Sequence, residues 1–328
     1  MATLYVVEQG AVVTKKGQRL LVSKGGELLQ EVPMIHVDRV VLMGNVHFTT
    51  PALVHMLKRR IDVVLLSCHG TLRGRIQPPW AKDARLRQRQ YELHRNDGVR
   101  LGLSKKFVLG KLRNMAVLWK RQRDGRSIGE HFKALKRLMG KAASASDLAK
   151  LRGYEGAASA QHFQVFKASL HQDLGFTGRA HRPPKDPVNA LLSLGYTLLH
   201  NELYALVTAV GFDPYMGFYH EIKHGHPALA SDLLEEWRPV IVDLLVLGLV
   251  NREEITPGHF RRTRTGLRLT KQGLTRFLEG YERRLTTRVI HPRLGRRLTY
   301  RRCLEAQVRL LAAYVRGESS MYEPFQWR

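Results

Sequence analysis

The sequence has few cysteines, no long hydrophobic run and no internal repeats. Cys68 and Cys303 are far apart, so they match neither a zinc-binding spacing nor a disulfide framework. The most apolar segment, residues 240–250, is interrupted by Asp243 and is much shorter than the roughly 20 residues that span a bilayer. The first residues lack the basic start of a secretory signal and reach Glu8 after a short apolar run. We therefore expect a reduced, cytoplasmic protein.

Acidic residues are also scarce relative to basic ones. The 328 residues include 54 Lys and Arg against 28 Asp and Glu, which gives a formal net charge of +26. Such an excess predicts a polyanionic partner, because each phosphate that Lys or Arg neutralises releases counterions and contributes to binding. Hydrophobic residues make up 44% of the chain, which is enough to bury a core. The composition favours a large, folded nucleic-acid-binding protein over a small ribosomal-type protein or a membrane-attached one.

Apolar residues in the first 80 positions alternate with the period of β-strands. Turn sequences such as Gly25-Gly26 and Gly44-Asn45 separate short alternating runs. Many short strands joined by tight turns predict an antiparallel β-sandwich-like domain over residues 1–80. We expect this domain to serve in dimerisation or docking, and contact of its basic edge with nucleic acid is the alternative. The predicted strands are 4–7, 11–13, 19–22, 28–32, 39–43 and 62–66, and the basic edge comprises Arg59, Arg60, Arg73 and Arg75.

The pattern changes at a Pro-Pro linker, residues 77–80, and becomes helical from about Asp83. The fold class expected is therefore α+β, with the β domain followed by a larger all-α domain over residues 81–328. We expect this second domain to carry both catalysis and DNA binding. A long core helix is predicted over 188–210, and Asp243 in the apolar segment that follows is interpreted as a paired structural acid.

One carboxylate falls on a mainly apolar helix face in the segment 146–170. Glu155 lies on the same face as His162 and Phe166, and small residues around it allow another element to approach closely. A carboxylate there needs a partner, and a buried ion pair with an arginine is as plausible as a metal ion. Glu202, on the predicted helix 188–210, is a competing candidate for a functional acid.

A second set of candidate ligands lies in the loop 211–220 and in the helix 227–238 that follows. Glycines and Pro214 constrain the loop, so we expect its last residue, His220, to be held on a fixed backbone. On the helix, Asp232 and Glu235 are three residues apart and share a face. One histidine with carboxylates suits Mg²⁺ or Mn²⁺ better than a closed zinc site. A surface ion-pair cluster is the alternative interpretation.

Basic residues in the second domain are candidates for contact with DNA phosphates. Arginine dominates lysine in the C-terminal third, which suits bidentate phosphate contacts, although a solvated helix face is the alternative for any single residue. The candidate DNA-binding residues are Arg179, Arg182, Lys185, Arg238, Arg261, Arg262 and Arg264.

Three pieces of sequence occur in a characteristic order. They are Tyr154-Glu155-Gly156, the loop Gly211-Phe212-Asp213-Pro214-Tyr215-Met216-Gly217-Phe218-Tyr219-His220, and Leu229-Ala230-Ser231-Asp232-Leu233-Leu234-Glu235-Glu236-Trp237-Arg238-Pro239. The ordered set resembles the CRISPR-associated integrase of spacer acquisition, which is also described as a metal-dependent DNA endonuclease. The likeness covers essentially the whole chain.

The resemblance implies a site, a reaction and partners. By position, the metal ligands are Glu155, His220 and Glu235, and Asp232 assists them; Glu235 stands where some relatives have Asp. The implied reaction inserts captured double-stranded DNA fragments into a CRISPR repeat by attack of a 3′-hydroxyl on a phosphodiester, with Mg²⁺ or Mn²⁺. A homodimer formed through the β domain and a small ferredoxin-like CRISPR-associated partner protein are implied as well. Two alternatives stay open: a stand-alone structure-specific nuclease on branched DNA, and a non-enzymatic nucleic-acid-binding protein.

Overall fold

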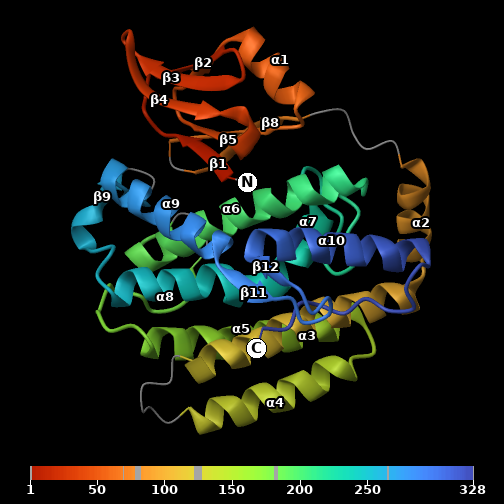
Figure 1. Ribbon diagram of the computed structural model, residues 1–328. Coiled ribbons are helices and arrows are strands. Elements are labelled where there is room, and N and C mark those ends of the chain that lie inside the picture. Colours follow the sequence, from red (N-terminus) through yellow and green to blue (C-terminus); the bar gives the residue numbers. More distant parts are fainter. Residues whose placement is uncertain are drawn as a thin grey trace. The chain divides into compact units, whose positions relative to one another are not determined.

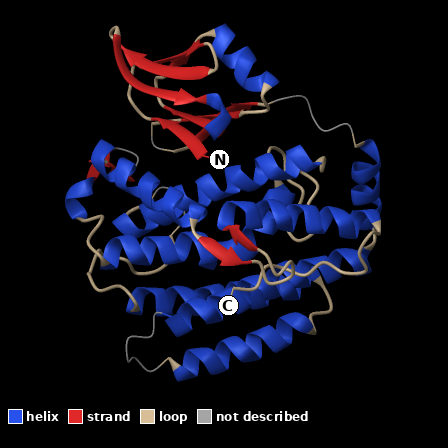
Figure 2. Cartoon of the chain, in the orientation of Figure 1, coloured by secondary structure: helices blue, strands red, loops and turns tan. Residues whose placement is uncertain are grey.

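The chain divides into two compact units, Met1–Trp80 and Ala81–Arg328. A computed structural model describes residues 2–68, 70–77, 83–121, 128–180, 184–263 and 266–327. Strands dominate the first unit and helices the second (Figures 1 and 2), which confirms the α+β class. Within these described ranges, no helix combines the length and the hydropathy that a membrane span requires.

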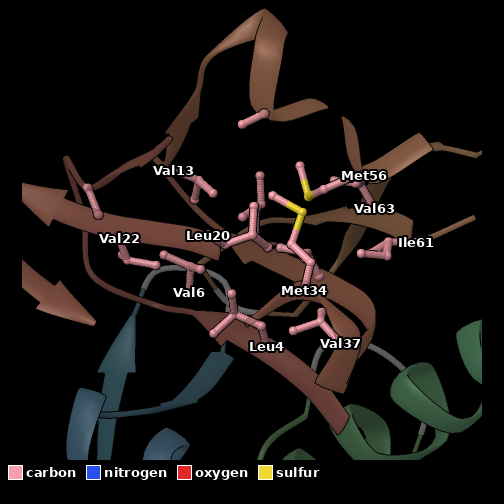
Figure 3. Packing of buried hydrophobic residues seen from close by; sticks show 14 residues of the cluster. Leu4, Val6, Val13, Leu20, Val22, Met34, Val37, Met56, Ile61 and Val63 are labelled. Carbon is pink, nitrogen blue, oxygen red and sulfur yellow. The ribbon is translucent and has the colours of Figure 1, made fainter. Parts of the chain in front are cut away.

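The first unit contains two sheets and one helix. The sheets have the strand orders β1-β5-β7-β8 and β4-β3-β2-β6. Buried side chains of both sheets meet in one apolar cluster, to which Met56 of the helix also contributes (Figure 3). Leu4 and Val6 of one sheet therefore share a core with Val13 and Leu20 of the other. The elements are β1 (Ala2–Val6), β2 (Val12–Lys16), β3 (Arg19–Lys24), β4 (Glu27–Pro33), β5 (Val37–Met43), β6 (His47–Phe48), α1 (Thr50–Lys58), β7 (Asp62–Leu66) and β8 (Leu72–Ile76).

Strand directions in this unit differ in part from the antiparallel arrangement expected. The β2-β3-β4 meander is antiparallel, but β1, β5 and β7 run parallel to one another. The reason lies in the connections between these strands. The β2-β3-β4 meander links β1 to β5 and α1 links β5 to β7, so that each of the three strands begins at the same edge of the sheet. Alternation of apolar residues fixes which side chains face the core, but it carries no information on strand direction.

One arginine of the predicted basic edge is part of the fold rather than of a free surface. Arg75 forms an ion pair with Asp62, and Arg39 approaches the same carboxylate with 3.1 Å between Nε and Oδ2. The side chain of Arg75 is only 7% exposed. An acid buried this far needs paired and hydrogen-bonded cations, so Arg39 and Arg75 compensate its charge.

Helices make up most of the second unit. The helix α7 is buried at all ten of its positions and packs against α3 and α6. The next six residues widen into a π-helix that contains Pro239, whose ring cannot donate the usual backbone hydrogen bond. The helices are α2 (Ala84–Arg95), α3 (Asp97–Arg121), α4 (Gly129–Ala143), α5 (Leu148–Ala168), α6 (Pro187–Val210), α7 (Ala228–Trp237), the π-helix (Arg238–Asp243), α8 (Leu244–Asn251), α9 (Lys271–Thr286) and α10 (Tyr300–Arg316).

The sequence pattern predicted an all-α second domain, and this prediction was wrong in part because the unit also contains strands. Two short hairpins interrupt it, formed by β9 (Phe260–Thr263) with β10 (Gly266–Leu269) and by β11 (Arg288–Ile290) with β12 (Arg297–Thr299). The hairpins are rich in arginine, which masks their alternation. The helices α4 and α10 were not predicted, because basic residues interrupt their apolar periodicity in the sequence.

Candidate active site

The loop that ends at His220 is held by one buried carboxylate, Asp232 of α7. Its Oδ2 accepts hydrogen bonds from the backbone N–H groups of Phe218 and Tyr219 at 2.5 and 3.0 Å, and its Oδ1 accepts one from the backbone of His220 at 2.8 Å. A Cβ atom at Gly217 would lie 2.8 Å from Asp232 Oδ2 and from the backbone of Ala228. Only glycine therefore lets the loop approach α7 this closely.

The same carboxylate orients the ring of His220. Nδ1 of His220 lies 2.8 Å from Asp232 Oδ1, which leaves Nε2 directed toward Glu235 at 4.0 Å from Oε1. Burial alone would lower the pKa of His220, but the hydrogen bond and the negative charges of Asp232 and Glu235 outweigh it and raise the pKa. A histidine whose second nitrogen is fixed by a carboxylate is the common arrangement of a metal-binding imidazole.

Glu235 lies on α7 one turn after Asp232 and is surrounded by cations. Its Oε1 lies 3.0 Å from Nε of Arg238, and its Oε2 lies 2.6 Å from Nζ of Lys111. Burial opposes ionisation of this carboxyl, but Arg238, Lys111 and His220 together lower its pKa to about 2. Glu235 is therefore an anion at neutral pH although its side chain is only 5% exposed.

Glu155 reaches the same place from α5. Its Oε1 pairs with Lys111 Nζ and accepts a hydrogen bond from Ser159 Oγ at 2.7 Å. The buried ion pair that we considered for Glu155 thus exists, but its partner is a lysine of α3 and not an arginine. Lys111 joins Glu155 and Glu235, which are 80 positions apart in the sequence.

Sequence reasoning missed Lys111, although a pattern pointed to it. Phe107 and Met115, four residues before and after it on α3, are fully buried core residues. A lysine in the middle of such an apolar stripe needs an anionic partner. Burial opposes its charge, but Glu235 and Glu155 outweigh burial and raise the pKa of Lys111.

Two other acids considered from the sequence have structural partners. Glu202, the competitor of Glu155, lies 3.3 Å from Arg301 of α10. Asp243 accepts hydrogen bonds from Tyr196 OH at 2.5 Å and is 2.9 Å from Nε2 of His162, which confirms its interpretation as a paired structural acid. Neither acid forms an ion pair with Lys111.

The predicted phosphate-binding residues fall into three groups. Arg179 is half-buried and donates hydrogen bonds to Asn189 and Ser193, so contacts within the fold occupy most of its donors. Arg238 forms an ion pair with Glu235, which occupies part of its donors. The exposed residues are Lys185, which follows the loop containing Arg179, and Arg261 and Arg262 on β9. Arg182 and Arg264 lie outside the described residues.

The exposed basic residues come from two segments that are joined. The backbone N–H of Leu267, on β10, donates to the carbonyl of Pro184 at 3.0 Å. The β9-β10 hairpin is therefore tied to the segment that contains Lys185.

The donor set fits a divalent cation in its chemistry. Glu155 and Glu235 offer carboxylate oxygens and His220 offers Nε2, which is the mixture that Mg²⁺ and Mn²⁺ accept. Oε2 of Glu235 is buried, and its close contact is the ion pair with Lys111 Nζ rather than a hydrogen bond of regular geometry. In the arrangement that the structure describes, no three His, Cys, Asp or Glu side chains of the described residues are close enough together to hold an ion. Lys111 Nζ lies between the two glutamates instead.

Comparisons with known proteins show the family and the fold to which the chain is similar. A family model described as "CRISPR associated protein Cas1" matches residues 4–283. A CRISPR-associated endonuclease Cas1 of Thermus thermophilus is 38% identical over 330 positions, covering 100% of this chain and 98% of the relative. A casposase bound to integration product has a similar fold, with a TM-score of 0.87, 24% identity and coverage of 98% of this chain and 93% of that one. A chain of a Cas6-RT-Cas1–Cas2 complex matches with a TM-score of 0.84 and 25% identity over 100% of this chain and 36% of that one.

Proposed function

The chain belongs to the family of CRISPR-associated protein Cas1, and from this premise we propose that it is a DNA endonuclease and integrase whose chemistry takes place between Glu155, His220 and Glu235. The convergence of these three side chains from α5, the loop before α7, and α7 carries the proposal. Glu155 and Glu235 share one cation, and His220 Nε2 faces Glu235. The net charge of +26 supports a phosphate-rich substrate.

Glu155, His220 and Glu235 would hold a Mg²⁺ or Mn²⁺ ion. When bound, such an ion supplies positive charge that polarises the scissile phosphate and stabilises the developing negative charge. Asp232 fixes the ring and the backbone of His220, so that Nε2 is presented toward Glu235. Arg238 helps to keep Glu235 ionised in spite of its burial.

The chemistry proposed is a phosphoryl transfer that needs no side-chain nucleophile. The 3′-oxygen of a captured DNA fragment forms a bond to phosphorus at the edge of a repeat, and its proton is lost. The bond from that phosphorus to the 3′-oxygen on its other side in the target strand breaks, and this oxygen leaves as a hydroxyl with a proton from solvent, which balances the proton that the attacking hydroxyl gives to solvent. Water in place of the 3′-hydroxyl gives cleavage, so nicking and integration share one site.

We also propose that two copies of the chain associate through the β domain. The strand β4 is an edge strand of its sheet, and two of its leucines, Leu28 and Leu29, are 51% and 44% exposed. An edge strand that carries exposed apolar side chains offers both backbone pairing and apolar surface to a second copy. A relative in complex with Cas2 supports assembly with a small ferredoxin-like partner protein.

Strand transfer tests the proposal. A DNA fragment with a free 3′-hydroxyl is incubated with a repeat-bearing plasmid and the small partner, in Mn²⁺, in Mg²⁺ and in EDTA. We expect transfer that requires the metal and falls by roughly 10²-fold or more in Glu155→Ala, His220→Ala and Glu235→Ala. Binding of the same DNA should stay within a few-fold, and Glu130→Ala, an exposed change on α4, serves as the matched control.

The outcomes separate the alternatives. Near-normal rates in two of the three variants would show that the ligands are assigned wrongly. Cleavage of branched DNA without transfer would favour a stand-alone structure-specific nuclease. DNA binding without metal-dependent cleavage or transfer would leave a non-enzymatic nucleic-acid-binding protein.

A further inference from the structure

Lys111 is a buried cation at the centre of the candidate active site. Its side chain is 7% exposed and its ammonium contacts one carboxylate from α5 and one from α7. The helix that carries it, α3, packs against both α5 and α7. The ammonium therefore connects three helices that bear or support the site.

Electrostatic repulsion between Glu155 and Glu235 explains why the ammonium of Lys111 lies between them. Glu155 and Glu235 repel each other and lose water on burial, so they need positive charge between them. Arg238 lies on the Glu235 side of the site, where it forms an ion pair with Glu235 and its guanidinium lies 4.6 Å from the ring centre of Tyr196. It therefore does not bridge the two glutamates. Lys111 alone bridges both glutamates among the ion pairs of the described residues.

An ammonium and a divalent cation placed between the same two carboxylates repel each other and compete for the same negative charge. The ammonium group of lysine is a donor with no lone pair, so Lys111 cannot serve as a metal ligand while it is charged. The glutamates that it joins are two of the three ligands assigned above. Two positive charges close together in a buried site repel, so entry of an ion favours departure of the ammonium from at least one of them.

We propose that Lys111 is a positioning residue that takes the place of the divalent cation in the metal-free protein and competes with it for Glu155 and Glu235. This inference rests on the proposed metal site. In the metal-free protein, Lys111 holds the two acids close together. The same contact weakens ion binding, because the ion must displace a charge that is already well placed.

Direct measurement of Mn²⁺ binding tests the competition without an assay of activity. The free ion is followed by electron paramagnetic resonance in the full-length protein without DNA, for the wild type, Lys111→Met and Lys106→Met. Lys106 is exposed on the same helix and controls for the loss of one positive charge. We expect Lys111→Met to bind Mn²⁺ roughly ten- to a hundredfold more tightly than the wild type. Lys106→Met should match the wild type.

Thermal unfolding gives an independent readout. In EDTA, Lys111→Met leaves Glu155 without its cation and Glu235 with one cation fewer, so its melting temperature should fall by roughly 6 to 12 °C. Saturating Mn²⁺ should restore most of this loss, since the ion replaces the missing charge. Mn²⁺ should raise the melting temperature of the wild type by a smaller amount.

Several results would overturn the inference. Mn²⁺ affinity of Lys111→Met that is equal to or weaker than that of the wild type would show that Lys111 does not compete with the ion. If Lys111→Met does not fold even with Mn²⁺, Lys111→Gln replaces it, since it keeps a hydrogen-bond donor and removes the charge; its Mn²⁺ affinity must then exceed that of the wild type. Glu235→Ala separates the two proposals. If it binds Mn²⁺ as the wild type does, the metal site itself is wrong, whereas loss of binding in Glu235→Ala with no change in Lys111→Met contradicts only the role of Lys111.

Discussion

Oδ1 of Asp232 lies 2.8 Å from both the backbone nitrogen and the ring Nδ1 of His220. One carboxylate oxygen thus fixes where the histidine stands and which way its ring faces. Asp232 is buried and also accepts two backbone hydrogen bonds from the loop, whereas the ion pairs of Lys111 are with Glu155 and Glu235, so Asp232 acts on the site through His220.

We expect Asp232→Asn to destabilise the protein and to weaken strand transfer less than loss of a ligand does. The amide replaces one acceptor oxygen with a donor, so at least one buried N–H group loses its partner, at a cost of roughly 1–3 kcal/mol. Urea unfolding and the strand-transfer rate measure the two effects. Asp213→Asn is the control, since Asp213 lies in the same loop and accepts hydrogen bonds from Tyr91 OH of α2 and from the backbone N–H of Tyr215. An unchanged unfolding free energy in Asp232→Asn would contradict this role.

Tyr196→Phe should lower the free energy of unfolding by roughly 1–3 kcal/mol. The hydroxyl of Tyr196 donates to buried Asp243, which also contacts His162 of α5, and the change leaves that carboxylate with one partner fewer. Urea denaturation provides the measurement. Tyr154→Phe, at a half-buried position, should change stability by less than about 0.5 kcal/mol. Equal effects of the two substitutions would mean that the Tyr196 hydroxyl contributes nothing specific.

Residues 1–80 should fold and self-associate when expressed alone. The unit has its own apolar core and an edge strand, β4, with exposed leucines. Sedimentation should give a dimer, and Leu29→Lys should convert it to a monomer because a charge then faces the partner. Leu72→Lys, an exposed position on the edge strand β8 of the other sheet, should remain dimeric. A monomeric wild-type fragment would exclude dimerisation through this unit alone.

Replacing Arg261 and Arg262 together by Gln should reduce the salt dependence of DNA binding. Each phosphate contact contributes about 0.9 to the slope of log K against log salt on duplex DNA, so the slope should fall by up to roughly two units. Arg252 and Arg283, which pair with Glu254, provide a matched double replacement that should leave the slope unchanged. The melting temperature should change little, since exposed charges contribute little to stability. If both double variants keep the wild-type slope, DNA takes another path over the protein.

The sequence by itself determined the class of the fold and many of its elements. Local patterns are sufficient for this purpose: period-two alternation placed six strands of the first unit, and apolar helical periodicity over residues 188–210 placed the long helix α6. The spacing of Asp232 and Glu235 also placed two acids on one helix face. Parallel pairing of β1, β5 and β7 was not predictable in this way, because direction depends on the connections between strands.

Only the tertiary structure decided how the acids are used. Asp232 and Glu235 share a helix face, yet Asp232 accepts hydrogen bonds from the loop backbone at Phe218, whereas Glu235 is joined through Lys111 to Glu155. These differences arise because burial and partners, and not residue type, determine what a carboxylate does. Lys111 shows the same point most clearly, since its neighbours in sequence are apolar and its two partners lie 44 and 124 positions away. Contacts over such separations are fixed only when α3, α5 and α7 pack together.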